Sequence, residues 1–238
     1  MESVDKILVE KGKGAHAGMM KFALGVFAKE PLPGTVKTRL SPPLTFEEAA
    51  SLYRASLEET VAQMAGAGLA VTLFYSGSEK YFCEAFPGMD REPQRGVNLG
   101  ERMENALTLL LSKGMSSAAL IGTDSPDLPP SLVKEAFEAL RNEEFVTIPA
   151  LDGGYVLVGE RRHVPELFKD MPWSTDRVLE ETRRRANLCG VKYRELRAWE
   201  DVDDLSSLQR LVERSPGSAT SRHAIAHLGR CLHRQESE

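Results

Sequence analysis

The sequence predicts a single α/β domain in which helices cover both faces of a mainly parallel sheet. Over most of the 238 residues, short apolar runs typical of buried strands alternate with longer segments whose apolar residues recur at helical spacing. Thr, Ser, Pro and Gly stand at many of the boundaries, as is usual where helices begin and end. A chain of this length suits one domain of this class.

The strands are predicted at 22–28, 70–75, 118–122, 145–149, 154–159 and 191–196. The helices are predicted at 45–65, 79–86 and 99–111, from Pro129 onward, and at 175–186 and 204–214. Thr45 and Glu48 match a capping box, in which each side chain bonds a free backbone N–H at the start of a helix. Ser174 is predicted to cap the helix 175–186.

The chain divides into three segments. Residues 1–20 are predicted to form an N-terminal extension, 21–214 the folded domain, and 215–238 a tail. The tail is compatible with a helix, because Ala224, Leu228 and Leu232 recur at helical spacing. Three residues of the tail that can ligate transition metals also recur at steps of four: His223, His227 and Cys231. The glutamate of the zinc-protease pattern is absent and the segment lies at a terminus, so a metal site there is the less favoured alternative.

Composition excludes several classes of function. The formal net charge of −5 argues against binding along nucleic acid, which needs a basic surface. Three widely spaced cysteines do not form a disulfide framework, so a cytoplasmic location is expected. No apolar run reaches the length of a membrane span.

A basic loop follows the first predicted strand. The segment LGVFAKEPLPGTVKTRL runs from an apolar strand into a loop with Lys29, Gly34, Lys37 and Arg39. Ligands of open α/β sheets bind beyond the carboxyl ends of the strands, where backbone N–H groups and cations hold phosphates. The loop therefore predicts a phosphate site, and the alternative is a solvated surface loop.

Two acidic segments supply candidate metal ligands. Asp124 follows the strand 118–122 in the segment TDSPD, and a carboxylate there suits Mg²⁺ or Mn²⁺. Asp127, in the same segment, is predicted to be structural. The second segment is EDVDD at 200–204, in which Asp203 is predicted as the second ligand. The alternative for this segment is a set of helix caps.

Two further segments are candidates for substrate contacts. Asp152, Gly153 and Tyr155 lie in the segment DGGY, which suits a tight turn and also a close approach of backbone to a sugar or base. Trp173 either stacks on a sugar or packs within the protein.

Six segments of the chain, in order, resemble a known family. They are FAKEPLPGTVKTRL, NLGERM, LIGTDSPDLP, DGGYVLVG, PWSTDRVLEET and DVDDL. They are similar to bacterial glycosyltransferase-like proteins of the nucleotide-diphospho-sugar transferase superfamily, and more distantly to the guanylyltransferases of molybdenum-cofactor and phospholactate pathways. The resemblance covers residues 21–211. It implies a single GT-A, Rossmann-like domain of three αβα layers with a mixed, mainly parallel sheet.

The resemblance also implies roles for residues. It implies a divalent metal on Asp124 and Asp203, and a sugar or acceptor pocket bordered by Asp152, Gly153 and Tyr155. We further predict catalytic roles for Asp124 and Asp152, and a substrate contact for Trp173. The resemblance implies that the nucleotide contacts Ala28, Lys29, Gly34, Lys37 and Arg39, and we predict Thr123 as a further nucleotide contact. The chain departs from the family pattern at Asn98, where an aspartate is usual, and after Asp203.

Three functions follow as hypotheses. The first is a Mg²⁺- or Mn²⁺-dependent glycosyltransferase that uses a nucleoside-diphosphate sugar and a small-molecule acceptor. The second is a nucleotidyltransferase that uses a nucleoside triphosphate and releases pyrophosphate. The third is a nucleotide-binding module without turnover. A homodimer is compatible with each of them.

Overall fold

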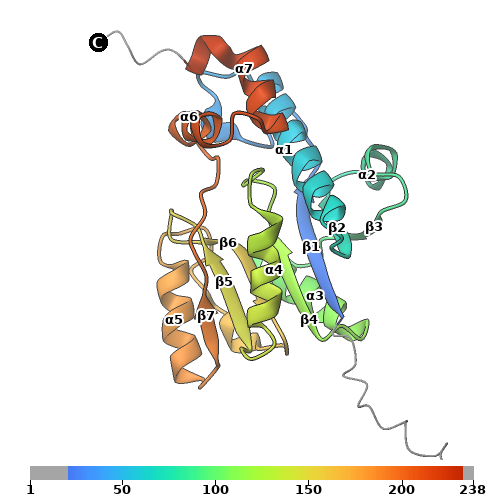
Figure 1. The fold of residues 1–238 in the computed structure, drawn as a ribbon, viewed down its shortest axis with the longest axis vertical. Helices are drawn as coiled ribbons and strands as arrows, with labels where there is room; N and C mark the ends of the chain where they lie inside the picture. Colours follow the sequence, from blue (N-terminus) through green and yellow to red (C-terminus); the bar gives the residue numbers. More distant parts are fainter. Residues whose placement is uncertain (1–20, 233–238) are drawn as a thin grey trace, which may run out of the picture.

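The computed structural model describes residues 21–232, so the predicted N-terminal extension 1–20 lies outside the described residues. Its centre is one seven-stranded sheet in the order β3-β2-β1-β4-β6-β5-β7 (Figure 1). The strands are β1 (Phe22–Lys29), β2 (Val71–Ser76), β3 (Asp90–Pro93), β4 (Ser117–Ile121), β5 (Phe145–Pro149), β6 (Tyr155–Glu160) and β7 (Tyr193–Glu195). Strand β6 is antiparallel to β4 and β5, and the other pairs are parallel. The predicted mixed, mainly parallel sheet is confirmed.

Helices cover both faces of this sheet, which gives the predicted three layers. The helices are α1 (Phe46–Gly66), α2 (Glu79–Ala85), α3 (Leu99–Ser112), α4 (Pro130–Ala139), α5 (Val178–Leu188), α6 (Leu205–Arg214) and α7 (Ala219–Leu232), with short 3₁₀ turns at Thr38–Leu40 and Pro165–Leu167. Helices α1, α2 and α4 pack in one core cluster, and α3 and α5 pack in the other. None of the helices in the described residues has the length and apolarity needed to cross a bilayer.

Local sequence signals place most helix starts. Thr45 accepts a hydrogen bond from the backbone N–H of Glu48, whose side chain bonds back to the N–H of Thr45, and this completes the predicted capping box. Asp204 caps α6 in the same way with Ser207. The prediction that Ser174 caps the next helix is wrong, because α5 begins three residues after the predicted 175 and Arg177 stands at its cap position. Strand β3 was not predicted, since its sequence Asp-Arg-Glu-Pro suits only an edge strand.

The tail segment forms α7, which packs beside α1 and α6 (Figure 1). A third apolar cluster joins these helices to the loop that follows β1. In it, Leu40 and Leu44 of the loop are buried among Leu208, Leu211 and Leu228 of the last two helices. The C-terminal helices therefore hold the basic loop in place.

A buried carboxylate anchors the start of α7. Glu59 of α1 accepts hydrogen bonds from the backbone N–H groups of Ala219 and Thr220, at 2.7 and 2.8 Å, and from the Thr220 hydroxyl at 2.7 Å. These donors lie at the N-terminus of the helix, where backbone N–H groups have no partner within the helix.

We expect Glu59→Gln to lower the free energy of unfolding by about 1–3 kcal/mol, because the amide turns a donor toward buried donors. Urea unfolding measures the change. Glu58→Gln is the matched control, since Glu58 is exposed on the same helix. Equal stability of the two variants would contradict the anchoring role of Glu59.

Candidate active site

A cavity of about 790 Å³ opens at the carboxyl ends of β1 and β4. Its walls come from the loop after β1, the loop after β4, the turn between β5 and β6, and the segment before α6. This is where ligands of open α/β sheets bind. Most of the predicted site residues line it: Lys29, Lys37, Arg39, Thr123, Asp124, Asp152, Tyr155, Trp173 and Asp203.

Three predicted site residues are not among those that line the cavity: Ala28, Gly34 and Gly153. Ala28 is buried in the core, and Gly34 sits in the loop with a φ of 77°. Gly153 has a φ of 91°, and a Cβ there would lie 2.1 Å from the carbonyl oxygen of Asp176. Gly153 thus lets the β5–β6 turn approach the loop before α5, which is a structural requirement.

Lys37 joins the basic loop to both acidic segments. Its ammonium group contacts the carboxylate of Asp124, lies 3.4 Å from Asp203 and donates to the carbonyl oxygen of Val202. The Lys37 side chain is only 5% exposed, whereas the side chains of Asp124 and Asp203 are 47% and 41% exposed, so the cation is buried and its partners still face the cavity. Lys37 has a φ of 48°, a left-handed conformation that is uncommon outside glycine.

Arg39 completes the charged edge of the cavity. Its guanidinium lies 3.3 Å from Asp203 and is 73% exposed. The predicted cationic and acidic sides therefore do face each other, and in the described residues they are ion-paired.

Tyr53 of α1 links the ends of the two central strands. Its hydroxyl oxygen accepts hydrogen bonds from the backbone N–H of Lys29 and from the hydroxyl of Thr123, both at 2.9 Å. Burial is the largest cause of the raised pKa of Tyr53, so the phenol stays protonated. Thr123 is buried and its hydroxyl is engaged with Tyr53, so it helps to hold the two strand ends together.

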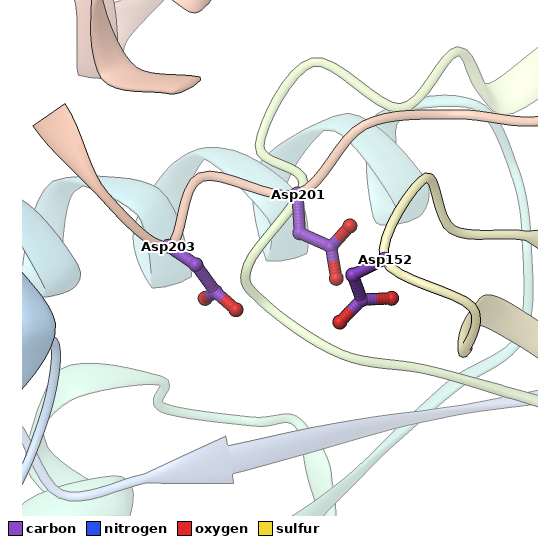
Figure 2. Close-up of side chains that lie close together, drawn as sticks. All are labelled: Asp152, Asp201 and Asp203. Carbon is purple, nitrogen blue, oxygen red and sulfur yellow. The ribbon is translucent and has the colours of Figure 1, made fainter. Parts of the chain in front are cut away.

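Three aspartates converge next to Lys37. Asp152, Asp201 and Asp203 place carboxylate oxygens within 4.8 Å of one another, and Figure 2 shows Asp152 reaching from the β5–β6 turn toward the other two. Burial, followed by the charges of Asp152, Asp203 and Asp124, raises the pKa of Asp201 to about 7. A set of hard oxygen donors of this kind suits Mg²⁺ or Mn²⁺.

This group differs from the predicted metal site in two ways. It includes Asp203 as predicted, and it also includes Asp201, which was not predicted. A sequence signal for Asp201 does exist, because Asp201 and Asp203 are two positions apart and lie on the same side of an extended chain. Asp124 is outside the group and contacts Lys37 instead.

Another part of the cavity lining is aromatic. The Trp173 ring stacks near Phe168 and meets Tyr155 edge to face, with ring centroids 6.4 and 6.3 Å apart. Trp173 thus packs within the protein and also lines the cavity. Arg102 of α3 and Asp176 line the cavity too, and neither was predicted from the sequence.

Asp127 is structural, as expected from its segment. It accepts hydrogen bonds from the side chains of Arg214, Trp199 and Ser215. Its carboxylate therefore ties the loop after β4 to the end of α6 and plays no part in the lining of the cavity.

Comparison with known proteins agrees with this architecture. A family model described as an uncharacterized protein conserved in bacteria (DUF2064) matches residues 59–175. The fold is similar to that of a provisionally named nucleotide-diphospho-sugar transferase from Desulfovibrio desulfuricans G20, with 28% identity, a TM-score of 0.83, and coverage of 90% of this chain and 97% of that one. The resemblance to the nucleotide-diphospho-sugar transferase superfamily is confirmed.

Two more distant structures share the fold alone. A cytidylyltransferase from Leptospira borgpetersenii serovar Hardjo-bovis (strain JB197) is 13% identical, with a TM-score of 0.56 and coverage of 92% and 100% of the two chains. A CMP:2-keto-3-deoxy-manno-octonic acid synthetase complexed with CTP is 13% identical, with a TM-score of 0.53 and coverage of 82% and 98%. No curated protein sequence matches the chain.

We expect Asp201→Asn to stabilise the metal-free protein at pH 8. The folded state raises the pKa of Asp201 from 3.8 to about 7. Protonation of Asp201 therefore contributes fully to the stability of the folded protein below pH 3.8, and this contribution is lost as the pH rises through 7. The variant should gain about 1 kcal/mol or more at pH 8 and much less at pH 5.

Urea unfolding in EDTA at the two pH values measures this difference. Asp90→Asn, at an exposed position in β3, is the control and should change little at either pH. A loss of stability in Asp201→Asn at pH 8 would contradict the raised pKa of Asp201.

Proposed function

We propose that the protein is a metal-dependent transferase that acts on a nucleotide-activated substrate, and that it transfers a glycosyl group from a nucleoside-diphosphate sugar. The observation that carries this proposal is one cavity in which Lys37 and Arg39 face Asp124, Asp152, Asp201 and Asp203. The similarity to a provisionally named nucleotide-diphospho-sugar transferase supports the glycosyl donor.

The charges of the cavity support dependence on a metal. Four cationic and five acidic side chains line it: Lys29, Lys37, Arg39, Arg102, Asp124, Asp152, Asp176, Asp201 and Asp203. With every carboxylate ionised the lining is net negative, which disfavours an anionic nucleotide on its own. Asp201 and Asp203 would hold a divalent ion with the carboxylate of Asp152 beside them, and Asp124 is a further proposed ligand because it shares Lys37 with Asp203. When bound, that ion would neutralise charge on the diphosphate.

The side chains can then perform the transfer. The bond between the anomeric carbon and the diphosphate oxygen breaks, and Lys37 and Arg39 stabilise the negative charge of the leaving diphosphate. The acceptor oxygen bonds to the same carbon and loses its proton to a carboxylate. We propose Asp152 for that base, since it is exposed at the β5–β6 turn and its carboxylate is oriented by the N–H of Gly154 at 2.9 Å.

Nucleotidyl transfer is the second candidate. The observation in its favour is that cations line the cavity on more than one side, which suits a longer chain of phosphates. In that reaction the acceptor attacks the α-phosphate of a nucleoside triphosphate and pyrophosphate leaves. Binding without turnover is the third candidate.

The released product separates these reactions. The full chain is incubated with Mn²⁺ and a panel of sugar nucleotides and nucleoside triphosphates, with mixed small-molecule acceptors. We expect release of a nucleoside diphosphate. Release of pyrophosphate would replace the glycosyl proposal with the nucleotidyl one, and saturable binding without either product would identify a binding module. Failure to bind any nucleotide would overturn the proposed function.

We expect Asp203→Asn to weaken nucleotide binding in the presence of Mn²⁺ by at least tenfold, because the variant removes a charge that Lys37 contacts and that the proposed ion would contact. Arg39→Gln should weaken it about tenfold through the loss of one charge-assisted contact. Calorimetric titration measures both, with Asp90→Asn as the control. Unchanged affinity in Asp203→Asn would remove the acidic cluster from the nucleotide site.

A further inference from the structure

Arg102 differs from Lys37 and Arg39, the two cations of the cavity that are ion-paired with aspartates. Lys37 and Arg39 contact Asp124 and Asp203, whereas Arg102 forms no ion pair within residues 21–232. Its Nε donates to the carbonyl oxygen of Gly96 at 3.1 Å, and the side chain lines the cavity. The two terminal NH₂ groups of the guanidinium are thus left for a ligand.

The loop before α3 holds Arg102 in position. Gly96 has a φ of 134°, and a Cβ there would lie 2.8 Å from the backbone nitrogen of Arg102, so the loop folds closely onto the first turn of the helix. Asn98 caps that turn by accepting from the N–H of Glu101 at 2.9 Å. Asn105 donates to the carbonyl oxygen of Arg95 at 2.9 Å and closes the loop on the helix.

Trp173 lies against the same turn of α3. A Cβ on Gly100 would lie 2.1 Å from the indole nitrogen, so the absence of a side chain at Gly100 makes room for the ring. The backbone before Trp173 is fixed as well, because the Arg185 guanidinium donates to the carbonyl oxygens of Glu166, Lys169 and Asp170. Arg102 and Trp173 therefore both line the cavity from positions that the first turn of α3 helps to fix, and they add an unpaired guanidinium and an aromatic surface to the same cavity.

This wall and the metal-binding side come from different layers of the fold. Arg102 belongs to α3, whose apolar face packs with Phe168 and the strand residues of the second core cluster. Lys37 and Arg39 belong to the loop that is held by α1, α6 and α7 through Leu40 and Leu44. Two groups of cations thus reach the cavity from opposite faces of the sheet.

We propose that Arg102, which lines the same cavity as Trp173, binds an anionic group of the second substrate, the acceptor, as a phosphate or a carboxylate. This inference rests on the proposed function, because it assigns the metal, Lys37 and Arg39 to the nucleotide. A guanidinium offers paired N–H groups that match either anion, and the ring of Trp173 supplies an apolar surface for the rest of the acceptor. The acceptor is therefore a small phosphorylated or carboxylated molecule.

Three probes that share a carbon skeleton test the charge requirement: glycerol 3-phosphate, glycerate and glycerol. Each is titrated into the full chain saturated with nucleotide and Mn²⁺, and tryptophan emission reports binding. Trp199→Phe provides a background in which Trp173 is the one remaining tryptophan of the two in the chain. We expect one anionic probe to bind at least tenfold more tightly than glycerol, and which one it is distinguishes a phosphate from a carboxylate.

Variants assign the preference to Arg102. Arg102→Gln should abolish the tenfold preference and leave the nucleotide dissociation constant within twofold, and Arg102→Lys should restore part of it. Arg95→Gln is the matched control, since Arg95 is exposed in the same loop and does not line the cavity. Thermal unfolding of each variant shows whether it is folded. If Arg102→Gln does not fold, Arg102→Lys tests the site in its place.

Three results would overturn the inference. They are an unchanged anion preference in Arg102→Gln, no anion preference in the wild type, and a tenfold loss of nucleotide affinity in Arg102→Gln, which would place Arg102 on the nucleotide. Failure of the wild type to bind any nucleotide is separate, because it overturns the proposed function. In that case the same probes, titrated without nucleotide, still show whether Arg102 selects an anion.

Discussion

The arrangement of the site depends on the contacts that the ammonium group of Lys37 makes with three residues. It joins the loop after β1 to Asp124 after β4 and to Val202 and Asp203 before α6. A hydrogen bond of 2.8 Å from the N–H of Val202 to the carbonyl oxygen of Asp124 runs beside it. One buried cation therefore fixes three segments that are distant in sequence. In the proposed function, the phosphates of a substrate would compete with Asp124 and Asp203 for this cation.

The same site is electrostatically strained. The ionised form of Asp201 is unfavourable in the metal-free protein, because burial and the charges of Asp152, Asp203 and Asp124 raise the pKa of its carboxyl group. Clusters of this kind are typical of functional sites, where binding of a cation offsets the cost in stability. The structural acid Asp127 contrasts with them, because Arg214 and Ser215 satisfy it fully.

The sequence predicted most elements because their signals are local. The strand Phe145–Pro149 and the start of α1 at its capping box lie where periodicity and caps placed them. Strand β3 was missed because an edge strand needs no apolar pattern. The contact of Lys37 with Asp203 joins residues 166 positions apart, and no local pattern specifies such a pair. Asp201 and Arg102 were missed for that reason, since their neighbours come from other segments of the chain.

The central claim is that cation and carboxylate sides of one cavity bind a nucleotide through a shared divalent ion. Calorimetric titration of the wild-type chain with the nucleotide that it prefers, with Mn²⁺ and then with EDTA, tests this most directly. The account predicts saturable binding of one nucleotide per chain with Mn²⁺ and at least a hundredfold weaker binding in EDTA, about 2.7 kcal/mol. Equal affinity under the two conditions would contradict it.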